Sequence, residues 1–309
     1  MKKSIFSYCE KIVKANYKMW WFLKEKKIAQ NPLILYRALY LFKIRLGQYL
    51  ALKKYRKDGL FVSVHIETCA YCNRKCSFCL NSDRYPNREL GFMPIKLWKK
   101  IIDELSEIKY KGKISPYYYG EPFLDKRLSE MISYAKKKCP YSYIQLNSNG
   151  DFLTEKLLLD LIENGVDKIL VTNYGKVGIP KNTPKINIEK ENKRLEYLYN
   201  KYPQFLRLRG WKAIDFVNRR GLVFKRPNLR KNDPCLYPSY QLVIDWKGDV
   251  LLCCNDYYAE FVMGNAAKES ILDIWKTQRF KNFRDVLKSG KREKIKICAD
   301  CDVIGDFEY

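Results

Sequence analysis

From about residue 59 onward the sequence repeats a strand, a loop and a helix, and this alternation constrains the fold more than any other feature. The segments expected as strands are 61–67, 115–119, 141–146 and 167–172. The segments expected as helices are 94–108, 125–138 and 154–164. Repeated units of this kind predict an α/β fold with a parallel sheet and right-handed crossovers, either open or closed into a barrel. Ligands in such folds bind at the carboxyl ends of the strands.

The loop after the first expected strand carries three cysteines with C-x3-C-x2-C spacing, at Cys72, Cys76 and Cys79. Three thiolates can hold three irons of a [4Fe-4S] cluster and leave the fourth iron without a protein ligand. An open metal position is where a metal site performs chemistry. A zinc knot is the alternative, because Cys69 completes two C-x2-C pairs, but zinc modules usually place a dozen or more residues between their pairs. Only three residues intervene here.

This cysteine loop resembles the signature of the radical S-adenosylmethionine (SAM) enzymes. The resemblance implies that the open iron chelates SAM and that the reduced cluster cleaves it to a 5'-deoxyadenosyl radical, which removes hydrogen from a substrate C–H bond. It also implies a partial (β/α)6 barrel of the TIM type over residues 59–225. A reducing flavodoxin or ferredoxin is the expected electron donor.

Further loops resemble the same family, in the same order along the chain. Gly120-Glu121-Pro122 is similar to the element that binds the SAM amino group, with Tyr119 in place of the family's first glycine. The string 147–149 is similar to the strand end that contacts ribose, since Asn and Ser offer short donors and acceptors. The resemblance therefore assigns SAM binding to Phe78, Gly120, Glu121, Asn147, Ser148 and Asn149.

A second unit with several cysteines is expected over residues 226–309, where alternating apolar residues predict a hairpin across 242–252. This unit resembles the small α+β SPASM or twitch extension of radical SAM enzymes, which carries auxiliary clusters. The resemblance implies one fully ligated [4Fe-4S] cluster, held by Cys235, Cys253, Cys298 and Cys301. Cys254 competes with Cys253 for the second position, and the family pattern favours Cys253. A structural zinc site is the alternative.

A fully ligated cluster can pass one electron but cannot bind SAM, which suits an oxidation. The resemblance extends to family members that oxidise a cyclitol alcohol, and it implies a dehydrogenase acting on a secondary alcohol of a sugar or cyclitol. Those members place an arginine shortly before the first auxiliary cysteine, and Arg219 occupies that region. A guanidinium does not deprotonate, so its expected role is to stabilise negative charge that develops on the carbinol oxygen.

Three other functions compete with this one. An epimerase would quench a carbon radical with a thiol, and Cys254 is the candidate donor. A peptide-modifying enzyme of the SPASM group is the second alternative, although such enzymes usually carry two auxiliary clusters. A zinc or Fe–S binding protein without catalytic activity is the third, and the three-thiolate loop argues against it. The chain has one histidine, His65, which argues against hydrolase triads.

Residues 1–58 are expected to form a basic, aromatic helical extension. They contain fifteen Lys and Arg against three Asp and Glu, a net charge of +12 within a total of +25. Such a segment either packs on the next domain or contacts an anionic membrane, which would make a lipid-linked sugar a substrate candidate. We see no recognisable domain for nucleic-acid binding. Eleven clustered cysteines and no secretory signal pattern favour a reducing cytoplasm.

Overall fold

The computed structural model describes residues 59–85, 88–179, 188–210, 218–223 and 232–303. All of them belong to one of the two units into which the chain divides, Asp58–Gly305. The predictions of a helical extension and of membrane contact for residues 1–58 lie outside the described residues. None of the helices in the described ranges is long and apolar enough to cross a membrane.

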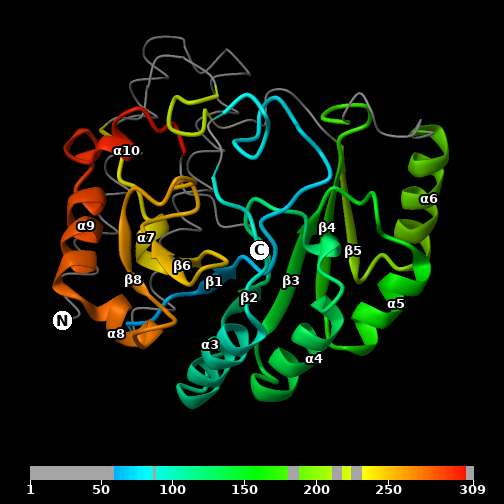
Figure 1. Cartoon of the computed structure of the whole chain (residues 1–309), viewed down its shortest axis with the longest axis horizontal. Coiled ribbons are helices and arrows are strands. Elements are labelled where there is room, and N and C mark those ends of the chain that lie inside the picture. The colour runs from blue at the N-terminus through cyan, green and yellow to red at the C-terminus, as the bar shows by residue number, and fades with distance from the viewer. Residues whose placement is uncertain (1–58, 86–87, 180–187, 211–217, 224–231, 304–309) are drawn as a thin grey trace, which may run out of the picture. The chain divides into compact units, whose positions relative to one another are not determined.

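One eight-stranded sheet organises these residues, in the order β5-β4-β3-β2-β1-β6-β7-β8 (Figure 1). Its parallel strands are β1 (Ser63–Ile66), β2 (Lys113–Ser115), β3 (Tyr143–Ser148), β4 (Lys168–Asn173), β5 (Leu206–Gly210) and β6 (Gln241–Ile244). β7 (Asp249–Leu251) and β8 (Val262–Asn265) add an antiparallel end. The strand order is linear, so the predicted partial barrel is present as an open sheet.

The sheet continues across the expected domain boundary at residue 225. The predicted hairpin forms, but its first strand, β6, pairs in parallel with β1, so that Ser63 lies opposite both Lys113 and Gln241. β1 and β6 are buried along their whole length. The cysteine-bearing C-terminal unit is therefore joined directly to β1, the strand that precedes the first cysteine loop.

The helices of the parallel part lie along the sheet in Figure 1. They are α3 (Ile95–Glu107), η2 (Pro122–Leu124), α4 (Leu128–Lys138), α5 (Glu155–Glu163) and α6 (Ile188–Lys201). α3 buries one apolar face at helical spacing, and Trp98 on that face donates from Nε1 to the Met131 carbonyl on α4 (3.1 Å). Thr154, the first residue of the helix expected over 154–164, caps α5, since its hydroxyl accepts from Leu157 N (3.2 Å).

The C-terminal unit adds short helices beside the antiparallel end of the sheet. They are α7 (Tyr237–Tyr240), α8 (Ile271–Lys276), α9 (Gln278–Lys288), η4 (Arg292–Lys294) and α10 (Lys296–Ala299). Ser270 and Thr277 cap α8 and α9 through their hydroxyls. These caps let two helices follow one another with a sharp change of direction.

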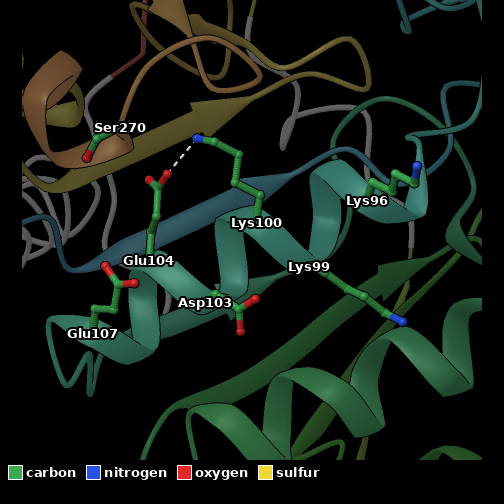
Figure 2. A pocket seen from close by; sticks show the side chains of 7 residues that line it. All are labelled: Lys96, Lys99, Lys100, Asp103, Glu104, Glu107 and Ser270. Carbon is green, nitrogen blue, oxygen red and sulfur yellow. Dashed lines mark hydrogen bonds and ion pairs between the residues drawn. The ribbon is translucent and has the colours of Figure 1, made fainter.

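A polar junction joins α3 to the segment before α8. Lys100 Nζ donates to the carbonyls of Ala266 (2.7 Å) and Glu269 (2.8 Å), and Glu104 accepts from Ile271 N (2.8 Å). A hollow of about 590 Å³ lies at this junction, lined by Lys96, Lys99, Lys100, Asp103, Glu104, Glu107 and Ser270. Figure 2 shows these side chains and the ion pair between Lys100 and Glu104. The lysines and acidic residues that line this hollow all lie on α3, and no cysteine lines it. We therefore interpret the hollow as part of the structural contact between α3 and the segment before α8.

Candidate active site

The first cysteine loop follows β1 and is fastened to the ends of β3 and β4 by one buried arginine. Arg74 donates from Nε to Asp151 Oδ2 (2.7 Å), after β3, and from Nη1 to the carbonyls of Gly175 (2.9 Å) and Val177 (2.8 Å), after β4. Asn73 donates to the same carboxylate (2.6 Å). Three strand ends are thus held together around the loop, as the parallel sheet requires.

The thiols of this loop lie in a buried setting that disfavours their charged form. Burial, together with the charges of Glu121 and Cys79, raises the pKa of Cys72 to about 12. Burial and the charge of Cys79 raise the pKa of Cys76 to about 12. Thiolates crowded in this way need a compensating cation, which a bound iron cluster provides.

The donor chemistry therefore fits an Fe–S cluster, and all three cysteines are free of disulfides. Within the ranges that the structure describes, no three His, Cys, Asp or Glu side chains already stand together as a metal-binding group. The cysteine side chains would turn toward a cluster when they bind it.

Gly120 and Glu121 at the end of β2 pack directly against the cysteine loop. A Cβ on Gly120 would lie 2.0 Å from the Cys69 carbonyl oxygen, so this contact permits only glycine. Glu121 N donates to the Tyr71 carbonyl (2.7 Å). The loss of the family's first glycine to Tyr119 therefore leaves the close backbone approach intact.

The Glu121 carboxylate is hydrogen-bonded to two other residues that are predicted to bind SAM. It accepts from Ser148 Oγ (2.8 Å) and Asn149 N (2.9 Å), and Asn149 Nδ2 lies 4.0 Å from Cys72 Sγ. Burial raises the pKa of Glu121 to about 7, and these hydrogen bonds oppose the rise. Gly120, Glu121, Ser148 and Asn149, four of the six residues predicted to bind SAM, thus meet beside the first predicted iron ligand.

The remaining two predicted SAM residues are less tightly grouped. Asn147 faces the opposite side of β3 from Ser148, and its side chain accepts from Gln145 (3.5 Å). Phe78 is buried with its ring centroid 5.4 Å from that of Tyr174, which follows β4. Phe78 therefore lies against the fourth strand end.

The second set of cysteines comes together from three segments of the C-terminal unit. Burial raises the pKa of Cys253 well above its usual value, and the charges of Cys298 and Cys301 add to the rise. Burial and the charge of Cys235 likewise raise the pKa of Cys298. The four predicted ligands are thus close enough to influence one another and are also free of disulfides.

Arg292, which sequence reasoning missed, holds these segments in place. It is 1% exposed and donates from Nε to the Asp233 carbonyl (2.7 Å), from Nη1 to that of Cys301 (3.0 Å) and from Nη2 to that of Pro234 (3.3 Å). Its guanidinium therefore ties the segment before Cys235 to the C-terminal cysteine pair.

Arg219 lies between the two cysteine sites. Burial raises the pKa of Cys79 and of Cys254, and in each case the charge of Arg219 opposes the rise. The Arg219 guanidinium donates from Nη1 to Asn255 Oδ1 (3.2 Å) and lies 5.4 Å from the ring centroid of Tyr119. One partly buried cation thus acts on a thiol of the first cysteine loop and on a thiol of the second.

Arg219 lies in a short segment of backbone, residues 219–221, with left-handed conformation. Arg219, Arg220 and Gly221 have φ values of 48°, 64° and 77°, a conformation that costs about 1 kcal/mol or more per residue that has a side chain. Asn218 anchors this segment by donating from its backbone N to Asp302 Oδ1 (2.9 Å). Such strain persists only where surrounding contacts enforce it, which supports a functional role.

Arg220 gives this segment its second anchor. It donates from Nη2 to Glu260 (2.7 Å) and pairs with Asp256 (3.5 Å), which follows the adjacent cysteines 253 and 254. The position of Arg219 is thus coupled to the loop that presents the second predicted auxiliary ligand. The sequence offered only the polar string 218–221 as a signal for this arrangement.

Four tyrosines fill the space beside Arg219. Ring centroids are 4.6 Å apart for Tyr118 and Tyr119, 4.6 Å for Tyr119 and Tyr257, and 5.0 Å for Tyr257 and Tyr258. We call these four residues the tyrosine cluster. Two follow β2 and two follow the cysteines at 253 and 254, so the cluster brings the two halves of the site together.

The fold and site together define an enzyme that binds SAM and iron–sulfur clusters, and comparison with known proteins agrees. Residues 66–172 match the family model of the radical SAM superfamily, and residues 235–302 match that of SPASM, an iron–sulfur cluster-binding domain. The chain is 33% identical over 251 residues to the S-adenosyl-L-methionine-dependent 2-deoxy-scyllo-inosamine dehydrogenase of Niallia circulans, covering 79% of this chain and 94% of that protein. This chain belongs to the radical SAM superfamily and carries a SPASM domain.

Other matches support the same family. The crystal structure of BtrN in complex with AdoMet and 2-DOIA is similar with a TM-score of 0.71 and 32% identity, covering 80% of this chain and 95% of that one. A cofactor-modifying protein for a tungsten-containing aldehyde ferredoxin oxidoreductase of Pyrococcus furiosus is 22% identical, covering 78% of this chain and 87% of that protein. The predicted radical SAM enzyme, its fold class and its SAM and iron–sulfur cofactors are thereby confirmed.

Proposed function

We propose that this enzyme oxidises a secondary alcohol of a sugar or cyclitol to a ketone. The observation that carries the proposal is Arg219, a partly buried cation that Asn255 holds near both the first cysteine loop and the second. The similarity to a dehydrogenase along 94% of its length supports the same reaction.

We assign the predicted residues to SAM and to two iron–sulfur clusters. Cys72, Cys76 and Cys79 would hold the SAM-binding cluster, with SAM contacted by Phe78, Gly120, Glu121, Asn147, Ser148 and Asn149. Cys235, Cys253, Cys298 and Cys301 would hold the auxiliary cluster. When bound, these groups supply a radical that removes a hydrogen atom and an acceptor for one electron.

Arg219 would act on the alcohol oxygen. Oxidation of a carbinol removes a hydrogen atom, a proton and an electron, and negative charge develops on oxygen as the proton leaves. A guanidinium keeps its charge, so Arg219 would stabilise that oxygen by donating a hydrogen bond in a water-poor setting. Asn255 would hold the guanidinium in the required orientation.

Product analysis tests the proposal. Anaerobically reconstituted protein is supplied with reductant, SAM and a panel of sugars and cyclitols, and 5'-deoxyadenosine and carbonyl products are measured together. Dehydrogenation predicts one ketone for each 5'-deoxyadenosine with at least one substrate. Formation of 5'-deoxyadenosine without any oxidised product would argue against it.

Epimerisation is a second candidate because Cys254 is a partly buried thiol near Arg219. Burial raises its pKa to about 12, so it keeps its proton at neutral pH and could donate hydrogen to a radical. We expect Cys254→Ala to retain ketone formation. An epimerase would instead lose all turnover in this variant while still cleaving SAM, and Cys139→Ala, a buried cysteine outside the site, is the matched control.

The proposals for the partners and the location rest on the sequence alone. We propose that a flavodoxin or ferredoxin supplies electrons and that the enzyme works in the cytoplasm. The net charge of +12 over residues 1–58 supports contact with an anionic membrane and a lipid-linked sugar as substrate. Flotation of the full chain with anionic and with neutral liposomes tests the contact.

A further inference from the structure

Arg88 is a buried arginine with hydrogen-bond donors that the fold does not use. Its side chain is 10% exposed, and Nη2 donates to Glu67 Oε2, just beyond the end of β1. Its Nε and Nη1 are buried and have no hydrogen-bond partner in the described ranges. Buried polar groups are nearly always hydrogen-bonded, and an unpaired donor on a charged group is especially costly. The unused donors of Arg88 therefore point to a ligand.

Arg88 adjoins the tyrosine cluster. Its Cζ lies 5.0 Å from the ring centroid of Tyr257 and 5.6 Å from that of Tyr118. The hydroxyls of Tyr118, Tyr119 and Tyr258 are buried and, among the described residues, lack hydrogen-bond partners as well. The tyrosine cluster thus holds three unused hydroxyl donors, two after β2 and one after the cysteines at 253 and 254.

The same cluster leads from Arg88 to the proposed reaction centre. Tyr118 contacts Tyr119, and Arg219 lies over the Tyr119 ring. A molecule whose alcohol meets Arg219 could therefore reach Arg88 across the tyrosine rings with another of its groups. SAM is not the expected occupant, because its predicted residues gather around Glu121 beside Cys72.

The charges around Arg88 favour an anion over a cation. Its acidic neighbour Glu67 is already engaged by Arg88 and by Tyr119 N (3.4 Å). Burial raises the pKa of Glu67 to about 7, and the charge of Arg88 opposes this rise. Asp245 accepts from the backbone N of Lys247 and Asp249 (both 2.9 Å). Within the described residues, the carboxylates nearest to Arg88 are thus occupied while donors are spare.

We propose that Arg88, with the hydroxyl of Tyr118, binds an anionic oxygen group of the substrate, either a phosphate or a carboxylate. This assignment rests on the proposed function, because it concerns the molecule whose alcohol Arg219 holds. A guanidinium fork suits both anions, since each presents paired oxygens at matching spacing. The substrate class is thereby narrowed to phosphorylated or acidic sugars and cyclitols.

Calorimetric titration of the reconstituted full chain tests this subsite with glucose 6-phosphate, glucuronate and glucose. We expect at least one anion to bind about tenfold or more tightly than glucose, the difference made by a charged hydrogen bond. Preference for the phosphate or for the carboxylate identifies the group. In Arg88→Gln the preference should disappear, and in Arg88→Lys part of it should remain because the charge is kept.

Two further variants serve as controls for the loss of binding preference in Arg88→Gln. Glu67→Gln combined with Arg88→Gln avoids an unpaired buried carboxylate and should show the same loss of preference. Arg127→Gln removes an arginine that is paired with Asp125 away from the tyrosine cluster, and it should bind as the unaltered protein does. Absence of any anion preference, or a preference that survives both Arg88→Gln variants, would overturn the subsite.

The titration is independent of turnover, so the two proposals can fail separately. Anion binding that depends on Arg88, without a ketone from any substrate, would retain the subsite and remove the dehydrogenase proposal. Efficient oxidation of neutral sugars, with no preference for an anion in binding, would retain the dehydrogenase proposal and remove the subsite.

Discussion

Replacing Arg219 by lysine should lower the rate of substrate oxidation at least about a hundredfold, while SAM is still cleaved. Loss of one preorganised donor to a developing oxyanion typically costs about a hundredfold to a thousandfold in rate. Lysine keeps the charge but not the planar fork that reaches Asn255 and an oxygen at the same time. The expected signature is therefore 5'-deoxyadenosine that accumulates without its equivalent of ketone.

The readout is the ratio of ketone to 5'-deoxyadenosine in anaerobic assays. Arg127→Lys, which changes an arginine outside the site in the same way, should leave that ratio unaltered. If Arg219→Lys oxidises substrate at the original ratio and rate, the arginine has no part in the reaction and the account of the site fails at its centre.

Replacing Cys298 and Cys301 together by alanine should abolish ketone formation and retain SAM cleavage. The two thiols are half of the predicted auxiliary donor set, and a cluster that loses half of its ligands is not retained. The first cysteine loop is fastened by Arg74 to the ends of β3 and β4 and does not depend on these residues. SAM chemistry should therefore persist without an acceptor for the second electron.

Iron analysis and the product assay check this variant side by side. Iron should fall from about eight to about four per chain, and Cys139→Ala should keep the full content. Continued ketone formation in the double variant would show that the auxiliary site does not take part in the oxidation.

Much of this fold was predictable because βα alternation leaves a strong local signal. The helix expected over 94–108 is observed as Ile95–Glu107, and the one expected over 154–164 is observed as Glu155–Glu163. The strand expected over 115–119 was wrong in its bounds and is observed as Lys113–Ser115. Its aromatic residues fit a strand by composition, but Tyr118 and Tyr119 pack with tyrosines from the C-terminal unit instead, a tertiary preference that local sequence does not contain.

The candidate site likewise contains residues that the sequence predicts and residues that only the structure identifies. Cysteine spacing and the short polar strings after the strands were enough to find Glu121, Ser148 and Asn149, which the structure joins by hydrogen bonds. Arg88 and Arg292 were missed, since each acts through a contact with a residue distant in the sequence, Glu67 for Arg88 and Asp233 for Arg292. Isolated arginines in a chain with 59 Lys and Arg carry no signal of their own.

Iron and labile sulfide in anaerobically reconstituted protein, measured beside a variant with Cys72, Cys76 and Cys79 changed to alanine, test the central claim most directly. The account predicts about eight irons falling to about four, with complete loss of 5'-deoxyadenosine formation, since only the first loop leaves an iron open for SAM. Few irons with bound zinc, or SAM cleavage that survives in the variant, would contradict it.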